Sequence, residues 1–188
     1  MVIVLKKKGF TLIELLAVIV ILGIIMTIAI PNVIATLDKN KKETFIEDAK
    51  KMVSAAEYKI RTDTKIEYPD QYSITVLKLS SLDTASLETS PYDTYYSIDK
   101  SFVAITKEDA NSTGVYDYVY YVHLVSCSDK ECEEPDNNRG INLSELSDLN
   151  TADRYDLVVK GVEVKDLINE DSFSTLKELL NRDNVNLY

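Results

Sequence analysis

An acidic side chain stands at the edge of the most apolar stretch of this chain. Lysines fill positions 6–8, Gly9 and Phe10 follow, and Glu14 comes one helical turn after Phe10. No side chain from residue 15 to residue 30 is charged. A charged side chain inside a bilayer costs about 3 kcal/mol on insertion scales. A carboxylate here therefore indicates a function and a partner of opposite charge.

The apolar stretch is long enough to cross a membrane. Residues 10–30, as an α-helix rising about 1.5 Å per residue, span roughly 31 Å, the thickness of a bilayer's hydrocarbon core. The preceding lysines favour a cytoplasmic N-terminus. An ordinary secretory signal peptide has a similar form, but it explains neither Glu14 nor the length, and no Ala-x-Ala cleavage site follows.

The junction resembles a known export signal. The sequence Lys-Gly-Phe-Thr-Leu-Ile-Glu-Leu occupies residues 8–15, Gly23 interrupts the apolar run and Pro31 ends it. This pattern is similar to the class III signal and N-terminal helix of type IV pilins and related pseudopilins. The resemblance covers residues 6–62.

The resemblance implies a processing step and a set of partners. A prepilin peptidase would cut between Gly9 and Phe10, and Phe10 would then be N-methylated. The new Phe10 ammonium would lie one turn from Glu14, within its own chain or on a neighbouring subunit whose register it sets, and both interpretations stay open. The implied partners are other pilin subunits in a homopolymer, the peptidase, a pilus assembly platform and the membrane.

The helix is expected to continue beyond the membrane. Apolar residues recur at the three-and-four spacing of one helix face, at Phe45, Ala49, Met52, Val53, Ala56 and Ile60. Gly23 and Pro31 predict a flexible anchor, with a kink or local melting near residues 26–31. We divide the chain into a leader (1–9), a transmembrane and assembly helix (10–31), its amphipathic continuation (32–62) and an extracytoplasmic head (63–188).

The head predicts an α+β fold, pilin-like as a whole, in which the long N-terminal helix packs against a small antiparallel sheet. Residues 97–106 and 115–125 have strand composition and form a hairpin if residues 111–114 turn. A third strand is expected at 154–160 and a short amphipathic helix at 173–180, whereas 74–82 is ambiguous between strand and helix. Tyr116, Tyr118 and Tyr120 alternate on one predicted strand. This is mostly ordinary strand composition, although an exposed aromatic face could bind glycans or another subunit.

The head is strongly acidic, with 11 basic and 25 acidic residues between positions 63 and 188. Because nucleic-acid binding depends on neutralising phosphates with Lys and Arg, we expect no direct nucleic-acid binding. Cys127 and Cys132 favour a structural disulfide on an extracytoplasmic head, with free thiols as the alternative. The run 133–139 is rich in oxygen ligands, which makes Glu133, Glu134 and Asp136 a weak calcium candidate, although a solvated loop is the simpler interpretation.

No catalytic constellation is visible. The chain has one histidine and neither a nucleophile motif nor a phosphate-binding loop, so we expect no enzyme and no cofactor. The expected function is a structural subunit of a type IV pilus, first a single-pass prepilin in the cytoplasmic membrane and then part of an extracellular fibre for adhesion, motility or colonisation. The alternatives are a pseudopilin of a type II secretion or DNA-uptake system, and a signal-anchored binding domain that never polymerises.

Overall fold

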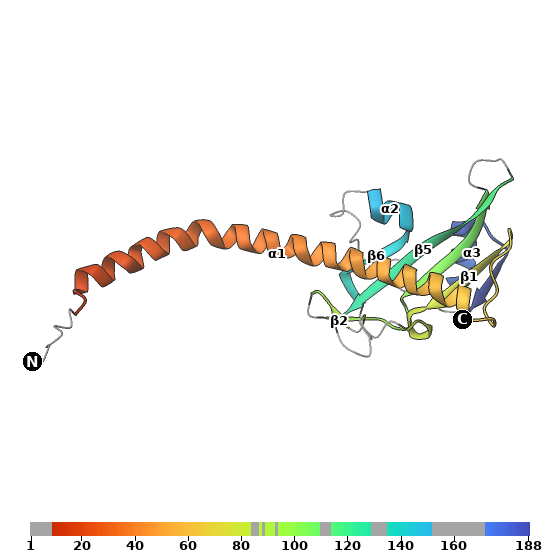
Figure 1. Cartoon of the computed structure of the whole chain (residues 1–188), viewed down its shortest axis with the longest axis horizontal. Helices are drawn as coiled ribbons and strands as arrows, with labels where there is room; N and C mark the ends of the chain where they lie inside the picture. The colour runs from red at the N-terminus through yellow and green to blue at the C-terminus, as the bar shows by residue number, and fades with distance from the viewer. Residues whose placement is uncertain are drawn as a thin grey trace, which may run out of the picture. The chain divides into compact units, whose positions relative to one another are not determined.

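A computed structural model describes residues 9–83, 87, 89–92, 94–109, 114–128, 135–151 and 172–188. The chain divides into two compact units, Met1–Asn40 and Lys41–Tyr188. One helix, α1 (Leu12–Thr62), contributes its first part to one unit and its second part to the other (Figure 1). Each unit is described below by itself.

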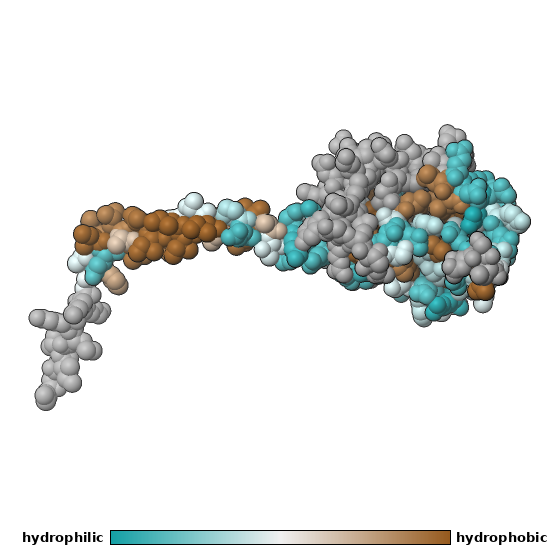
Figure 2. Space-filling view, turned by 90° about the horizontal axis from the view of Figure 1, so that it is seen from above, coloured by the Kyte–Doolittle hydropathy of each residue, from teal (hydrophilic) through white to brown (hydrophobic). Residues whose placement is uncertain are grey.

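In the first unit, every described side chain is exposed, from Gly9 to Asn40. Figure 2 shows apolar side chains covering this part of α1 on the face in view. The helix is long and apolar enough to cross a membrane. Its apolar surface continues past Pro31 to Leu37, which is 52% exposed. This unit presents an apolar surface that its own residues do not cover.

Helix α1 is continuous through Gly23 and Pro31. Proline has no N–H to donate to the carbonyl four residues earlier, which is that of Thr27. Nearby polar side chains bond to the helix backbone: the Thr27 hydroxyl donates to the Gly23 carbonyl at 2.8 Å, and Asn32 donates to the Ile28 carbonyl at 3.2 Å. Because α1 is unbroken, local melting near residues 26–31 is absent from this structure, and the kink expected as its alternative stays a prediction. Whether the anchor stretches inside a bundle stays a prediction.

In the second unit, the remainder of α1 buries one face. The six apolar residues predicted to share a stripe are all buried, which confirms that interpretation. Ile46 and Asp48 are buried as well. The stripe packs on one face of a sheet, against Leu77, Ile105 and Leu124 among others. The sequence predicted only apolar residues on this face, whereas the structure also buries Asp48 there.

Within the described residues the sheet has seven strands, which are β1 (Ser73–Lys78), β2 (Thr89–Ser90), β3 (Thr94–Tyr96), β4 (Phe102–Asp109), β5 (Tyr116–Cys127), β6 (Pro135–Glu145) and β7 (Asn184–Leu187). Their order is β2-β3-β5-β4-β1-β7, and β6 also pairs with β5. All pairs are antiparallel except β1 with β7, which run parallel. The α+β class is confirmed, with a mixed sheet in place of the purely antiparallel one expected.

Three short helices complete the described chain: η1 (Leu79–Ser81), α2 (Leu146–Thr151) and α3 (Ser172–Leu180). Helix α3 matches the amphipathic helix predicted near the C-terminus. Its Leu176 is buried with Ile74, Phe102 and Ala104 in a second apolar cluster, separate from the cluster that contains α1. Because side chains alternate between the two faces of a strand, the sheet lies between α1 and α3.

The predicted hairpin is present as β4 and β5, paired from Phe102 with His123 to Asp109 with Tyr116. Strand β4 begins five residues later than expected, because residues 98–100 form a turn in front of it. The ambiguous segment 74–82 is strand β1 followed by the single turn of η1. The strand expected at 154–160 lies outside the described residues.

Candidate functional site at the start of the long helix

The first turn of α1 is closed by reciprocal hydrogen bonds between Thr11 and Glu14. The Thr11 amide and hydroxyl donate to Oε2 of Glu14 at 2.8 and 2.9 Å, and the Glu14 amide donates to the Thr11 hydroxyl at 3.3 Å. The Thr11 carbonyl accepts from the Leu15 amide at 3.2 Å. Thr11 thus stands at the N-cap position and Glu14 is the third helical residue. The arrangement is a capping box.

The capping box gives Glu14 a structural role within its own helix. The first amides of a helix have no partner inside the helix, and the box satisfies two of the N–H groups at this end. A carboxylate in the first turn also interacts favourably with the positive end of the helix dipole. The carboxylate therefore has a local structural role that does not depend on any second chain.

The capping box leaves one carboxylate oxygen available. Both bonds from Thr11 go to Oε2, and the described residues provide none to Oε1. A shallow hollow of about 390 Å³ lies beside Glu14, lined also by Gly9, Phe10 and Thr11. Cutting the chain between Gly9 and Phe10 would keep the Thr11 amide as an amide. Capping by Oε2 and attraction of an ammonium to Oε1 are therefore compatible.

The peptide bond in front of this turn is accessible. Gly9 and Phe10 are both exposed, and the Phe10 side chain is 87% exposed. Helix α1 begins at Leu12, so the bond between Gly9 and Phe10 lies outside helical hydrogen bonding. A peptidase could therefore reach this bond without unwinding the helix.

Thr11 is the residue that the sequence interpretation missed. The Phe10 ammonium is the partner of opposite charge that the resemblance implies, whereas Thr11 is an uncharged partner. The signal was nonetheless present, because Thr11-Leu12-Ile13-Glu14 has the Ser/Thr-x-x-Glu/Gln spacing of a capping box directly before an apolar run.

The other predicted site residues are dispersed. Cys127 is fully buried at the end of β5, and Cys132 lies outside the described residues, so the bridge between them stays a prediction. Of the calcium candidates, Glu133 and Glu134 also lie outside them, while Asp136 belongs to strand β6 and not to a loop. Among the residues that the structure describes, no group of three or more His, Cys, Asp or Glu side chains could hold a metal.

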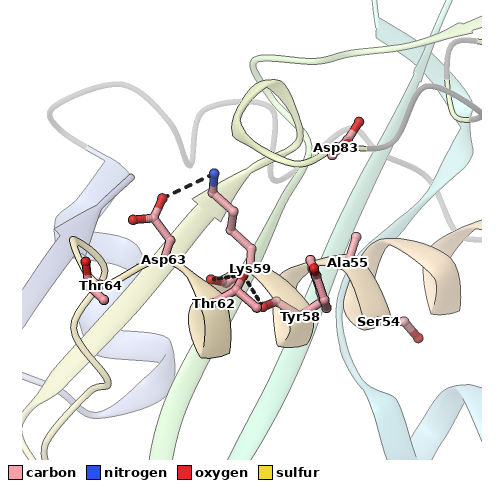
Figure 3. Close-up of a pocket in the computed structure, with 8 residues that line it drawn as sticks. All are labelled: Ser54, Ala55, Tyr58, Lys59, Thr62, Asp63, Thr64 and Asp83. Atoms are coloured by element: carbon pink, nitrogen blue, oxygen red, sulfur yellow. Dashed lines mark hydrogen bonds and ion pairs between the residues drawn. The ribbon is translucent and has the colours of Figure 1, made fainter.

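A second hollow, of about 680 Å³, lies beside the end of α1 in the head. Its lining residues are shown in Figure 3, where Lys59 reaches Asp63. These two side chains form an ion pair at 3.3 Å. A hydrogen bond from the Lys65 amide, followed by the bond from Lys59, lowers the pKa of Asp63. The lysine in this hollow is thus already paired with Asp63.

Residues 4–30 match the family model described as the prokaryotic N-terminal methylation motif. This motif is the class III signal peptide of type IV pilins, and it indicates a type IV pilin-like or pseudopilin precursor. It implies processing by a prepilin peptidase and assembly in the membrane with other pilin subunits. No curated protein and no solved structure matches the chain significantly.

Proposed function

We propose that this chain is a structural subunit of a type IV pilus, polymerised through residues 10–31 of its N-terminal helix. The prepilin peptidase cuts between Gly9 and Phe10, and Phe10 is N-methylated. The precursor is first anchored in the cytoplasmic membrane, with its N-terminus on the cytoplasmic side. It is then extracted into a fibre that displays the acidic head.

The observation that carries the proposal is the uncovered apolar surface that follows the capped turn. Side chains such as Leu16, Ile21 and Ile25 are 52%, 56% and 55% exposed within an unbroken helix. An apolar surface of this extent requires lipid or other apolar helices around it. A precursor needs lipid, and a fibre with a core of N-terminal helices supplies the same environment without lipid.

Glu14 is proposed to guide the exchange between these environments. In an apolar bundle, a carboxylate without a counter-charge is strongly penalised, whereas an ammonium at its free oxygen is strongly attracted. The capping bonds from Thr11 hold the carboxylate at the helix start while Oε1 accepts the Phe10 ammonium of a neighbouring subunit. Only the correct axial register then neutralises both charges.

Two substitutions separate the capping role from the charge role. Glu14→Gln removes the charge but keeps a side chain that can complete a capping box. Thr11→Ala removes the cap and keeps the charge, at a cost of about 1 kcal/mol to the helix end. We expect Glu14→Gln to abolish surface fibres and Thr11→Ala to reduce them, measured as subunit in sheared fibres. The cleaved form should accumulate in the membrane in both variants.

The outcomes distinguish the proposed roles. Wild-type fibre yield from Glu14→Gln would refute the ammonium-pairing role. Complete loss of fibres in Thr11→Ala with normal yield in Glu14→Gln would assign Glu14 to capping alone. The same preparation tests the class of filament, since a pseudopilin forms short fibres that remain with a secretion or DNA-uptake system, and an anchored domain forms none.

The mass of the mature N-terminus tests the processing step. The expected mature chain begins with methylated Phe10. A mature chain beginning beyond residue 30 would instead identify a removed secretory signal, and it would overturn the proposed fibre core.

A further inference from the structure

Four tyrosines form a continuous surface at one end of the sheet in the head. Tyr116, Tyr118 and Tyr120 occupy alternate positions of β5, so their side chains share one face. It is the face that packs on α1, because Tyr120 contacts the apolar cluster to which Val122 belongs. Tyr116 and Tyr118 continue this row beyond the core and are 39% and 40% exposed.

Tyr68 joins the row from a different part of the chain. It lies between α1 and β1, and its ring centroid is 4.8 Å from that of Tyr118, with the ring planes inclined by 45°. Tyr68 is itself 40% exposed. We call these four residues, Tyr68, Tyr116, Tyr118 and Tyr120, the tyrosine platform. Sequence alone placed three of them together, and the fold adds the fourth.

Charges of both signs surround the platform. Lys107 stands over the Tyr116 ring, with Nζ 5.4 Å from its centroid, and is opposite Tyr118 across the β4–β5 pair. Near the end of α1, Arg61 and Glu57 form an ion pair close to Tyr120. Asp109 is opposite Tyr116 across the same pair, so the surroundings are polar and carry charges of both signs without a positive excess.

The platform combines flat apolar rings with hydrogen-bonding edges. Burial, followed by the nearby Glu57, raises the pKa of Tyr120 to about 12, so its hydroxyl remains a donor at neutral pH. A tyrosine ring offers an apolar face and a polar tip. The matching ligand has flat patches of C–H groups edged by hydroxyls, and it has no net charge.

We propose that the tyrosine platform binds a neutral oligosaccharide, with sugar rings stacked on Tyr118 and its neighbours and hydroxyls bonded to Lys107 and to the Arg61–Glu57 pair. Charge decides between this ligand and other occupants of an aromatic surface. A single-stranded nucleic acid also stacks on aromatic rings, but it needs a positive groove. The region from residue 63 to residue 188 carries 25 acidic against 11 basic side chains and repels a polyanion. A wholly apolar partner would leave the tyrosine hydroxyls and the surrounding charges unpaired.

The test uses the full-length chain in a detergent without a sugar headgroup, so that the detergent cannot compete. The probes are cellohexaose, chitohexaose and mannohexaose, measured by titration calorimetry and by saturation-transfer NMR. We expect at least one to bind, with transfer to tyrosine ring protons. Tyr118→Ala should weaken that binding about tenfold, the equivalent of one lost stacking contact, and Tyr118→Phe should keep most of it.

Tyr95→Ala is the matched control, because Tyr95 is 37% exposed and pairs with Cys127 at the other end of β5. It should bind as the wild type does. Thermal unfolding of each variant shows whether the head is folded, and Tyr68→Ala replaces Tyr118→Ala if that variant is not.

Three outcomes would overturn the proposal. The first is no binding of any probe up to about 10 mM. The second is equal weakening by Tyr95→Ala. The third is evidence for another ligand. Tighter binding of a dT12 oligonucleotide would assign the platform to nucleic acid, and self-association that Tyr118→Ala abolishes would assign it to a second copy of the chain. The measurement needs no polymerised subunit, so its failure is distinct from a failure of the proposed fibre function.

Discussion

The two parts of helix α1 use apolar residues for opposite purposes. Between Leu12 and Asn40, no described side chain is buried. Between Lys41 and Thr62, the helix buries a stripe from Phe45 to Ile60 against its own sheet. Between Leu15 and Ile30 the first part has apolar residues around its whole circumference, whereas the second part has them on one face. A helix segment that is apolar on one face can be covered by its own chain. A segment that is apolar on all sides needs lipid or other helices around it.

Polar groups follow the same division. Glu14 is held by Thr11, three residues away on the same helix turn. Asp48 is 5% exposed and accepts a hydrogen bond at 3.0 Å from the hydroxyl of Tyr96, which lies 48 residues away on β3. Lys51 supplies its second bond, at 2.8 Å. The first part of the helix satisfies Glu14 within one turn, whereas Asp48 in the second part also needs a partner that the tertiary fold brings to it.

The largest expected effect comes from truncating an apolar side chain in each part. Phe45 is fully buried and its ring meets that of Tyr96 at 5.3 Å, so Phe45→Ala should lower the free energy of unfolding of the head by about 3–5 kcal/mol. Leu22 is 47% exposed, and Leu22→Ala should change that free energy by less than about 0.5 kcal/mol. Urea unfolding of the full chain in micelles, followed by near-ultraviolet circular dichroism, measures both.

Leu22→Ala should have a clear effect on fibre yield although it has little effect on unfolding. That variant should lower fibre yield while leaving the head as stable as in the wild type. If Leu22→Ala destabilised the head as much as Phe45→Ala, the division of α1 into two functions would be wrong.

Acidification should weaken the head through His123. Its ring is fully buried beside Phe102, and among the described residues neither nitrogen has a hydrogen-bonding partner in good geometry. Burial lowers the pKa of His123 from 6.5 to about 3, an effect that the backbone of Ile141 opposes only in part. Between these pH values the unfolded chain binds a proton that the native head does not bind. Stability present above pH 6.5 is therefore lost as the pH falls, by up to about 1.4 kcal/mol per pH unit.

His123→Leu removes this contribution and leaves the carboxylates unchanged. Above about pH 7, the difference in unfolding free energy between wild type and variant should not depend on pH. Below that pH, the wild type should lose stability relative to the variant. Identical pH profiles for the two proteins would show that His123 is not buried in the neutral form. The exposed N-terminal part of α1 contributes nothing to this difference.

The smallest of the three effects tests the long-range partner of Asp48. Tyr96→Phe leaves the buried carboxylate with Lys51 alone and should cost about 1–3 kcal/mol in urea unfolding. Tyr95→Phe is the matched control on the same strand, because Tyr95 is 37% exposed, and it should be nearly neutral. Equal effects of the two substitutions would mean that the bond between Tyr96 and Asp48 contributes nothing to stability.

The predictions that held depend on periodicity over a short range. The three-and-four spacing in the second part of α1 named six residues, and all are buried. β-branched and aromatic composition located β4 and β5. In α3 the amphipathic pattern is confirmed by the buried Leu176, although Leu179 is 62% exposed. In each case the signal lies in the element's own residues.

The elements that the sequence did not predict are strands that form by pairing with another strand. Residues 133–139 looked like a solvated loop, yet β6 begins at Pro135 because its backbone pairs with β5, as in the pair of Leu124 with Ile141. Strand β7 has four residues and too little pattern to predict, and it forms by lying parallel to β1. A polar or short segment adopts the strand conformation when a neighbouring edge offers hydrogen bonds.

The N-terminal sequence alone is enough to predict the apolar helix, and its spacing encodes the Thr11–Glu14 turn. These features need only contacts within one helical turn, so they can be deduced from neighbouring letters. Cleavage between Gly9 and Phe10 stays a prediction from the same letters. The tertiary structure alone decided the mixed sheet, the pairing of Asp48 with Tyr96 and the meeting of Tyr68 with Tyr118. Those contacts join residues dozens of positions apart, and they form only because packing of α1 on the sheet offsets the entropy cost of bringing distant segments together.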